Sequence, residues 1–239
     1  MNRVKLLNDI GNQITDCRIK CERIEKNRKE GIYPRCFYPE VKNKKLGYFD
    51  YIVIGINPGT ASDLERAFVK YIKMHKLEFG FEAVRIVMRP IVESNDYYKR
   101  VRAFLELYPK NRKKKLNILW TELVKCQNQL DKNKKKLPLN KTTEERCFKK
   151  FLKKEIGIFT KCEKKPILVL LGDKALNCII RYIKKSKNGK KEFDSFWCLK
   201  LYHPTGSRIF NPYYFRGKNI KNRLRKDHLP PKQNFSQFI

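Results

Sequence analysis

Three short stretches of the chain pair an apolar run with a polar residue that could take part in chemistry. The first is Gly-Ile-Asn-Pro-Gly at 55–59, which closes a β-branched run. Such a run closed by Gly and Pro predicts a buried strand leaving a parallel sheet, and open α/β sheets bind their ligands at that end of the strands. Asn57 is therefore either a turn residue, as Asn often is, or a polar group that faces a site.

Two further strand ends carry side chains of the same kind. Glu122 follows the strand expected at 116–121, and His203 follows the strand expected at 196–202. Because parallel strands end at one edge of a sheet, these side chains and Asn57 could border one pocket. The alternative for His203 is a structural histidine that is held by hydrogen bonds.

The elements that would position these residues alternate along the chain. Apolar runs predict strands at 50–56, 116–121, 166–172 and 196–202, with a weaker candidate at 84–88. Amphipathic spacing predicts helices at 2–29, 62–78, 96–108, 143–156, 173–185 and 212–226. This alternation indicates crossover connections and hence an α/β fold with a mostly parallel sheet. No Gly/Ser linker divides the chain, so we expect one domain over 1–239 with a basic C-terminal tail from about 212.

The charge of the chain is strongly positive. It holds 56 Lys and Arg against 24 Asp and Glu, a formal charge of +32, with lysine runs at 112–115, 132–136 and 184–191. Such a charge suits a polyanion, and DNA is the partner we expect. The alternative is a gene composition that favours lysine codons, since solvated lysine is tolerated almost anywhere on a surface.

No apolar run approaches the ~18 residues of a membrane span, and the N-terminus has no apolar leader segment. We therefore expect no membrane association and an intracellular location, cytoplasmic or with the nucleoid or nucleus, rather than secretion. In such a compartment the eight cysteines predict metal ligation or ordinary burial rather than disulfides.

Taken together, the motifs resemble those of the uracil-DNA glycosylase superfamily. GINPG is similar to motif A of the mismatch-specific and thymine-DNA branches, and HPTGS at 203–207 is similar to motif B. TELVKC at 121–126 and LLGDKAL at 170–176 resemble segments of the iron–sulfur branch, family 4. The four motifs follow the family's order over roughly 17–208.

The resemblance implies a three-layer αβα sandwich around a central, mostly parallel four-stranded sheet. It also implies hydrolysis of the N-glycosidic bond of a flipped-out deaminated or modified base, such as uracil, in base-excision repair. Asn57 matches the position that orients the attacking water, and His203 matches the histidine that would stabilise negative charge on the departing base.

The same resemblance, together with the chemistry of base flipping, proposes further contacts. Around the base we expect Gly55, Ile56, Glu122, Phe68 and Tyr202. Against the DNA we expect Pro58, Gly59, Thr205, Gly206, Ser207, Arg208, Ile209 and Phe210. Either Phe68 or Tyr202 would stack on the base, and the apolar pair after Arg208 would fill the gap left in the duplex.

Family 4 members hold a four-iron, four-sulfur cluster, and Cys17, Cys21, Cys126 and Cys147 match its ligands by position. The early pair is spaced C-x3-C where C-x2-C is usual, so Cys36 is an alternative ligand. A tetrahedral zinc ion would accept four thiolates equally well. The other thiols, expected in the core, are Cys162, Cys178 and Cys198. We expect no small-molecule cofactor beyond the cluster, and a monomer.

Glu122 departs from the family, which usually has Asn there. An ionised carboxylate offers only acceptors, so it suits a base edge with two donors, such as guanine N1–H and N2–H2 or N3-protonated cytosine. A protonated Glu122 could imitate Asn if burial raised its pKa, or the side chain could point elsewhere, toward a lysine. The competing functions are a non-catalytic nucleic-acid-binding relative that keeps fold and cluster, and a zinc-stabilised binding protein.

Overall fold

The chain was analysed as a computed structural model, and the structure describes residues 2–26, 32–41, 48–59, 62–75, 81–107, 115–160, 162–185, 193, 195–201 and 233–234. The strands are β1 (Tyr38–Glu40), β2 (Tyr51–Gly55), β3 (Ile118–Glu122), β4 (Ile167–Leu171), β5 (Trp197–Leu201) and β6 (Gln233–Asn234). They form one mixed sheet in the order β1-β3-β2-β4-β5-β6.

The middle of this sheet is parallel and its edges are not. β3, β2, β4 and β5 run parallel, whereas β1 is antiparallel to β3 and β6 is antiparallel to β5. The expected four-stranded sheet is thus corrected to a mixed one. Each outer strand has only two or three residues in the ladder, which leaves too short a run to read from the sequence.

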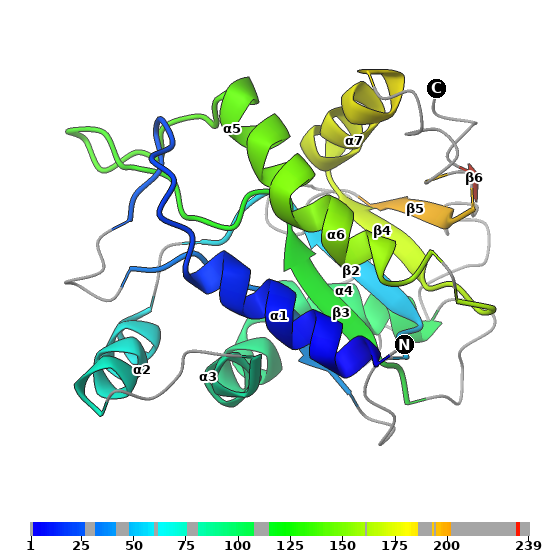
Figure 1. The fold of residues 1–239 in the computed structure, drawn as a ribbon, viewed down its shortest axis with the longest axis horizontal. Coiled ribbons are helices and arrows are strands. Elements are labelled where there is room, and N and C mark those ends of the chain that lie inside the picture. Colours follow the sequence, from blue (N-terminus) through cyan, green and yellow to red (C-terminus); the bar gives the residue numbers. More distant parts are fainter. Residues whose placement is uncertain are drawn as a thin grey trace.

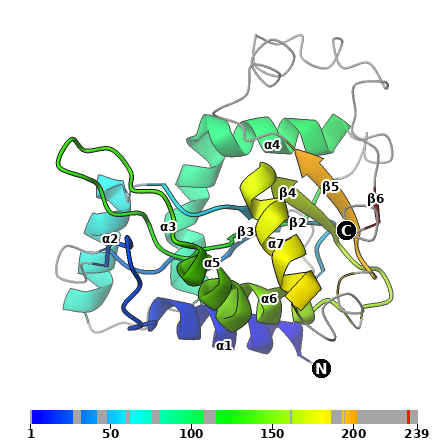
Figure 2. The same cartoon turned by 90° about the horizontal axis from the view of Figure 1, so that it is seen from above.

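Both faces of the parallel strands are buried, which is why they read as unbroken apolar runs. In β2, Ile52 and Ile54 belong to one apolar cluster, while Tyr51 and Val53 belong to another on the opposite face. The chain is therefore an α/β protein with helices packed on both faces of its sheet (Figures 1 and 2).

One face is covered by α1 (Arg3–Thr15), by the helical segment at 141–157, and by α7 (Asp173–Lys185) (Figure 1). The middle segment comprises α5 (Lys141–Cys147), a π-helical turn (Phe148–Leu152) and α6 (Lys153–Gly157). The π-helical turn begins directly after Cys147, and such turns frequently mark functional positions.

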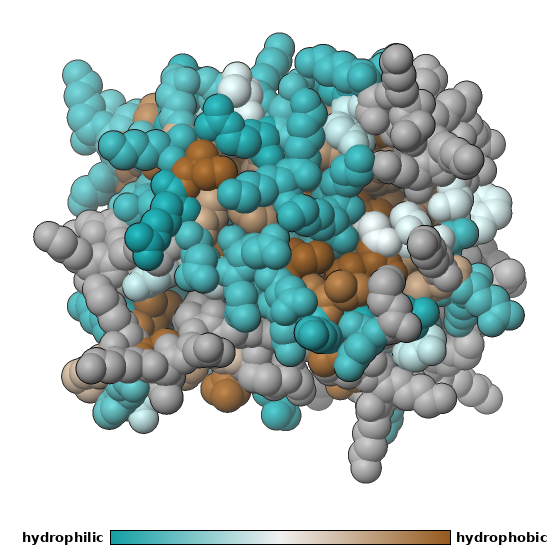
Figure 3. All heavy atoms as spheres, viewed as in Figure 1, coloured by the Kyte–Doolittle hydropathy of each residue, from teal (hydrophilic) through white to brown (hydrophobic). Residues whose placement is uncertain are grey.

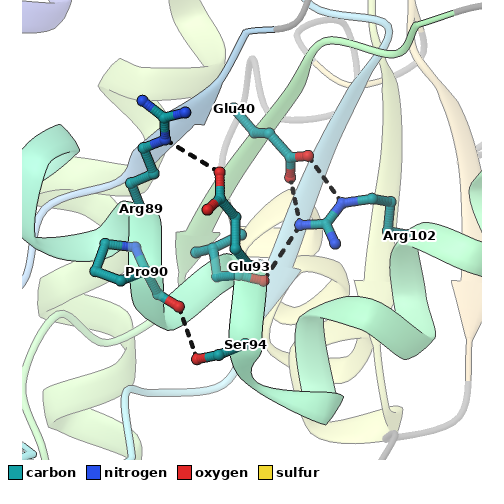
Figure 4. Close-up of polar contacts among 7 residues, drawn as sticks. Glu40, Arg89, Pro90, Glu93, Ser94 and Arg102 are labelled. Atoms are coloured by element: carbon teal, nitrogen blue, oxygen red, sulfur yellow. Dashed lines mark hydrogen bonds and ion pairs between the residues drawn. The ribbon is translucent and has the colours of Figure 1, made fainter.

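The other face is covered by α4 (Asp96–Leu107), whereas α3 (Phe81–Ser94) lies at the β1 edge of the sheet in contact with α1 and α4, and α2 (Asp63–Met74) lies beside α3 (Figure 2). Arg102 of α4 binds both carboxylate oxygens of Glu40 in β1, at 2.8 and 3.0 Å (Figure 4). Glu40 also accepts from the Trp120 indole. This buried group of partners fixes α4 to the sheet edge.

In α3, the Ser94 hydroxyl donates to the Pro90 carbonyl, and Arg89 pairs with Glu93 (Figure 4).

Two of the expected elements were wrong. The helix expected at 2–29 ends at Thr15, so Cys17 and Cys21 lie in a non-helical segment rather than on a helix face. The strand expected at 84–88 lies inside α3. The helix expected at 212–226 falls outside the described residues.

Candidate active site and cysteine cavity

The loop after β2 and the loop after β3 lie side by side. Gly55 is the register partner of Glu122, and beyond the strands the amide N–H groups of Leu123 and Val124 donate to the carbonyls of Gly55 and Ile56, both at 2.9 Å. β2 is flanked by β3 and β4, so the strand order reverses here. Ligands of open α/β sheets bind outside such a reversal.

The Glu122 carboxylate lies directly over Gly55. A methyl group added at Gly55 would fall on the carboxylate oxygens, which gives a physical reason for glycine at this position. The Oε2 atom of Glu122 is buried and has no hydrogen-bond partner among the described residues. Burial raises the pKa of this carboxyl from 4.5 to about 7, against the opposing effect of the nearby cations Lys125 and Arg35.

Two tyrosines and an ion pair surround Glu122. Tyr97 and Tyr98 open α4, and burial, followed by the charge of Glu122, raises the pKa of both phenols well above its usual value. Arg35 binds Glu65 at 2.8 Å. The sequence reasoning missed both tyrosines, although two adjacent aromatics at a helix start were a visible signal.

Glu65 also holds the start of α2. Its carboxylate accepts from the Ser62 backbone N–H at 2.8 Å, and the Ser62 hydroxyl accepts from the Glu65 N–H at 3.2 Å. This reciprocal pair is a capping box, so the residue that binds Arg35 is also fixed to the first turn of α2.

Asn57 lies in a bend after β2 and is half-buried. Its side-chain Nδ2 donates to the Pro58 carbonyl at 3.1 Å and to Oδ1 of Asn128 at 3.0 Å. Asn57 thus lies at a bend, and its side chain is held by a residue from a distant part of the chain.

The remaining predicted site residues divide into two groups. Pro58 is buried, Gly59 is exposed, and Phe68 is half-buried on α2. The other group lies outside the described residues and comprises Tyr202, His203, Thr205, Gly206, Ser207, Arg208, Ile209 and Phe210. The structure therefore brings Gly55 and Glu122 together and places Asn57 two residues beyond Gly55, with its side chain on Asn128. The position of His203 is left untested.

All four predicted ligand cysteines line one cavity. Cys17, Cys21, Cys126 and Cys147 line it together with Lys26 and other residues. They come from three separate segments: the stretch after α1, the loop after β3, and the end of α5. Cys36, the alternative ligand, is buried in the core and does not line this cavity.

Polar hydrogens point at two of these sulfur atoms. The backbone N–H of Lys125 donates to Sγ of Cys147 at 3.4 Å, and the Lys26 ammonium lies 3.9 Å from Sγ of Cys17. Burial raises the pKa of Cys126 to about 12 and that of Cys147 to about 11. Without a bound cation these two thiols stay protonated, so a metal centre would have to displace their protons.

The four cysteines line one cavity but do not form a ready metal site among the described residues. Among the described residues, no three His, Cys, Asp or Glu side chains are placed to hold a single metal ion. Zinc requires four sulfurs at about 2.3 Å from one centre.

The three thiols expected in the core are there. Cys162, Cys178 and Cys198 are all buried within the apolar cluster on the α1 face. Burial raises the pKa of both Cys178 and Cys198 to about 12, as for inert structural cysteines.

A buried ion pair lies between the two parts of the site. The Lys125 ammonium contacts Glu155 at 2.6 Å and donates to the Thr121 hydroxyl at 2.6 Å, and that hydroxyl donates to Glu155 at 2.6 Å. The side chains of Lys125 and Glu155 are 1% and 0% exposed. Lys125 lies three residues after Glu122 and directly before Cys126. The buried ion pair therefore anchors the segment that carries Glu122 and Cys126.

No family model matches the chain, and no curated protein matches its sequence. Within the part of the chain that the structure describes, no helix combines the length and apolarity needed to cross a membrane.

Proposed function

We propose that the chain is a DNA glycosylase of the uracil-DNA glycosylase type, which hydrolyses the bond between a damaged base and its deoxyribose. The observation that carries the proposal is the contact of the GINPG loop, which follows β2 beside the strand-order reversal, with Glu122 at the end of the neighbouring strand β3. Glu122 contributes a buried oxygen without a hydrogen-bond partner among the described residues. Buried polar atoms normally have a partner, so an unsatisfied one at such a position suits recognition of a ligand.

The arrangement of helices and strands also supports this proposal. Helices on both faces of the sheet correspond to the three-layer αβα sandwich of that superfamily, with the antiparallel edge strands β1 and β6 as additions.

The proposed chemistry assigns each residue one task. The glycosidic bond breaks as positive charge develops on the sugar and negative charge on the base, and His203 would stabilise the base as it departs. Asn57 would orient the attacking water through its amide, without a titrating proton. Glu122 would read the edge of the base, either as an ionised acceptor or, near and below its pKa of about 7, as a donor.

The cysteine cavity would hold a four-iron, four-sulfur cluster on Cys17, Cys21, Cys126 and Cys147. The fit rests on four thiols around one space and on the N–H group that points at Cys147. Hydrogen bonds to the ligand sulfurs are a recurrent feature of such centres. When bound, the cluster would supply a cross-link between three separate chain segments, which stabilises the fold around the site.

DNA is the proposed partner, bound by a monomer. The formal charge of +32 supports it, as do the exposed lysines of the loop at 132–136. Among the described residues on the face in Figure 3, most are hydrophilic, with apolar residues showing near the centre.

The test is a screen for base release. Iron-loaded protein is incubated with oligonucleotides that each carry one modified base, single- or double-stranded, on either side of the Glu122 pKa of about 7. Abasic sites are then revealed by cleavage in alkali. We expect cleavage for at least one base, and a loss of about 100-fold or more in Asn57→Ala with DNA binding retained. Asn133→Ala, an exposed Asn on the lysine loop, is the matched control and should keep full activity.

A second candidate is a non-catalytic DNA-binding relative with the same fold and cluster. It is favoured by the engagement of the Asn57 amide with Asn128 and by the carboxylate at position 122. Protein that contains iron and sulfide and binds DNA, yet creates no abasic site in any substrate, would support this candidate. Zinc in place of iron and sulfide would contradict the cluster.

A further inference from the structure

Asn57 is held in a defined orientation by its two hydrogen bonds. Its side-chain amide faces the Pro58 carbonyl, which can only accept, so the atom on that side must be the NH2 group. The same NH2 group reaches Oδ1 of Asn128 at 3.0 Å. With both hydrogens engaged on that side, the Oδ1 atom of Asn57 is turned away from Asn128.

Asn128 is oriented by the same logic. Its own NH2 group donates to the Leu137 carbonyl at 2.7 Å, again an atom that can only accept. This leaves its oxygen facing Asn57. The two amides therefore form a directional chain, from Asn57 to Asn128 to the backbone at Leu137, in which no amide can be reversed without placing two acceptors against each other.

The segment that carries Asn128 is fixed to the cysteine-bearing segments. Asn128 forms an antiparallel bridge with Ile24, the Glu25 N–H donates to Gln127 at 3.1 Å, and the Gln129 N–H donates to Arg23 at 3.0 Å. The residues at 23–25 begin two positions after Cys21, and Gln127 directly follows Cys126. A displacement of either cysteine would therefore move Asn128.

We propose that Asn128 is a positioning residue, which holds the Asn57 amide in its working orientation and ties that orientation to the cysteine-lined cavity. The inference rests on the proposed function for the role of Asn57, and it adds a residue that matches none of the sequence motifs. It assigns the cysteine centre a second effect besides stability: loss of the centre would release Asn57 while the sheet beneath it stays folded.

The catalytic arm of the test is a double-mutant cycle under single-turnover conditions. Asn128→Ala should lower the rate of base release about tenfold, as expected when one neutral positioning hydrogen bond is lost, with KM for DNA unchanged. In an Asn57→Ala background the same substitution should cost nothing further, because residues that act through one another are not additive.

Gln129→Ala is the matched control for this cycle. Gln129 is the exposed neighbour of Asn128 in the same loop, and its substitution should leave the rate unchanged in both backgrounds. If Asn128→Ala lowers the rate by the same factor with and without Asn57, then Asn128 does not act through Asn57, and the proposal is wrong.

The second arm needs no activity. In protein labelled with nitrogen-15, the side-chain NH2 signals of Asn57 should shift in Asn128→Ala and stay in place in Gln129→Ala. Removal of the iron with a chelator should shift these signals in the wild type and have no further effect in Asn128→Ala. If the wild-type Asn57 signals do not shift when the iron is removed, the proposed link between Asn57 and the cysteine cavity is wrong. If the Asn57 signals shift as expected but the wild-type protein releases no base from any substrate, the positioning role of Asn128 is supported and the glycosylase activity is contradicted.

Discussion

A carboxyl group buried against a glycine must stay neutral or find a cation, and Glu122 lies between these two states. Burial raises its pKa to about 7, while Lys125 and Arg35 act in the opposite direction without pairing directly with it. Lys125 is instead committed to Glu155, and Arg35 to Glu65. Near neutral pH the side chain can thus donate or accept, and this protonation state would decide which base edge it can bind.

The first prediction concerns the choice of base. Uracil presents an acceptor at O4, so wild-type protein should release it at about pH 6, where Glu122 is largely protonated, and far less at about pH 8. Glu122→Asn should restore release at the higher pH, since a mismatched polar edge can cost up to about 10⁴-fold. The rate of uracil release against pH in both proteins measures this. Strong uracil release by the wild type at about pH 8, unchanged in Glu122→Asn, would show that the carboxyl does not face the base.

The second prediction concerns stability and needs no substrate. A folded-state pKa above the unfolded value means that the folded state binds the extra proton, so the contribution of Glu122 to stability is present below about pH 4.5 and lost as the pH rises through about 7. Glu122→Gln should therefore match the wild type at low pH and exceed its stability at about pH 8, by about 3 kcal/mol. Denaturant titrations at both pH values measure this difference.

Exposed Glu163 provides the control for that comparison. Glu163→Gln should leave the stability within about 0.5 kcal/mol at either pH. An equal effect of the two substitutions would locate the pH dependence outside the site.

At the scale of elements, the site depends on the contact between β2 and β3. Gly55 and Glu122 are register partners, and the loops beyond them continue the pairing by two further hydrogen bonds. This arrangement lets a carboxylate lie across the neighbouring strand, where any side chain at position 55 would displace it.

The third prediction is that Gly55→Ala folds but changes recognition. The added methyl meets the end of a flexible side chain, so the carboxylate can swing away without moving either strand. Thermal unfolding should change little, whereas the dependence of base release on pH near 7 should disappear. A variant that unfolds, or one that keeps the wild-type pH dependence, would contradict this position for the carboxylate.

The sequence predicted the elements of the sheet better than the path of the chain around the cavity. The four parallel strands and α7 were expected at nearly their observed bounds, because long apolar runs and strong helical periodicity are local signals. Gly172, within LLGDKAL, adopts φ of 85° at the start of α7, a conformation that favours glycine.

The failures have physical causes of their own. Apolar residues spaced three or four positions apart continue beyond α1 through Cys17, Cys21 and Ile24, which is why a helix was expected up to residue 29. These three side chains line a cavity instead of forming a helix face. The segment 84–88 is too short to distinguish a strand from a helix by its apolar spacing. The helical spacing, which includes Val84, Val87 and Val92, can be recognised only over the whole of α3. The contact of Asn57 with Asn128 joins residues 71 positions apart, and no local pattern contains it.

At the scale of the whole molecule, the excess of positive charge is carried in part by ordered loops. In the loop at 131–136 the Asp131 carboxylate accepts from the backbone N–H groups of Asn133 and Lys135, both at 2.8 Å, and the lysines stay exposed. This loop starts three residues after Asn128, so a phosphate-binding surface would adjoin the segment that positions Asn57.

The fourth prediction is a steep dependence of DNA binding on salt. Lysines that neutralise phosphates release counterions, so affinity should fall about 100-fold between about 50 and 200 mM salt. Replacing Lys134 and Lys135 by Gln should reduce the slope by about one for each lost phosphate contact. Affinity that barely changes over this range would remove nucleic acid as the explanation of the charge.

The proposed glycosylase activity depends on Asn57 as the residue that orients water for cleavage of the glycosidic bond. The most direct measurement is the single-turnover rate of base release by wild type and Asn57→Ala, with saturating iron-loaded protein on the substrate found by the screen. Saturation removes differences in binding, so the rates report the chemical step alone. We expect the rate in Asn57→Ala to be lower by a factor of at least about 100, with equal DNA affinity for the two proteins. Equal rates would contradict it.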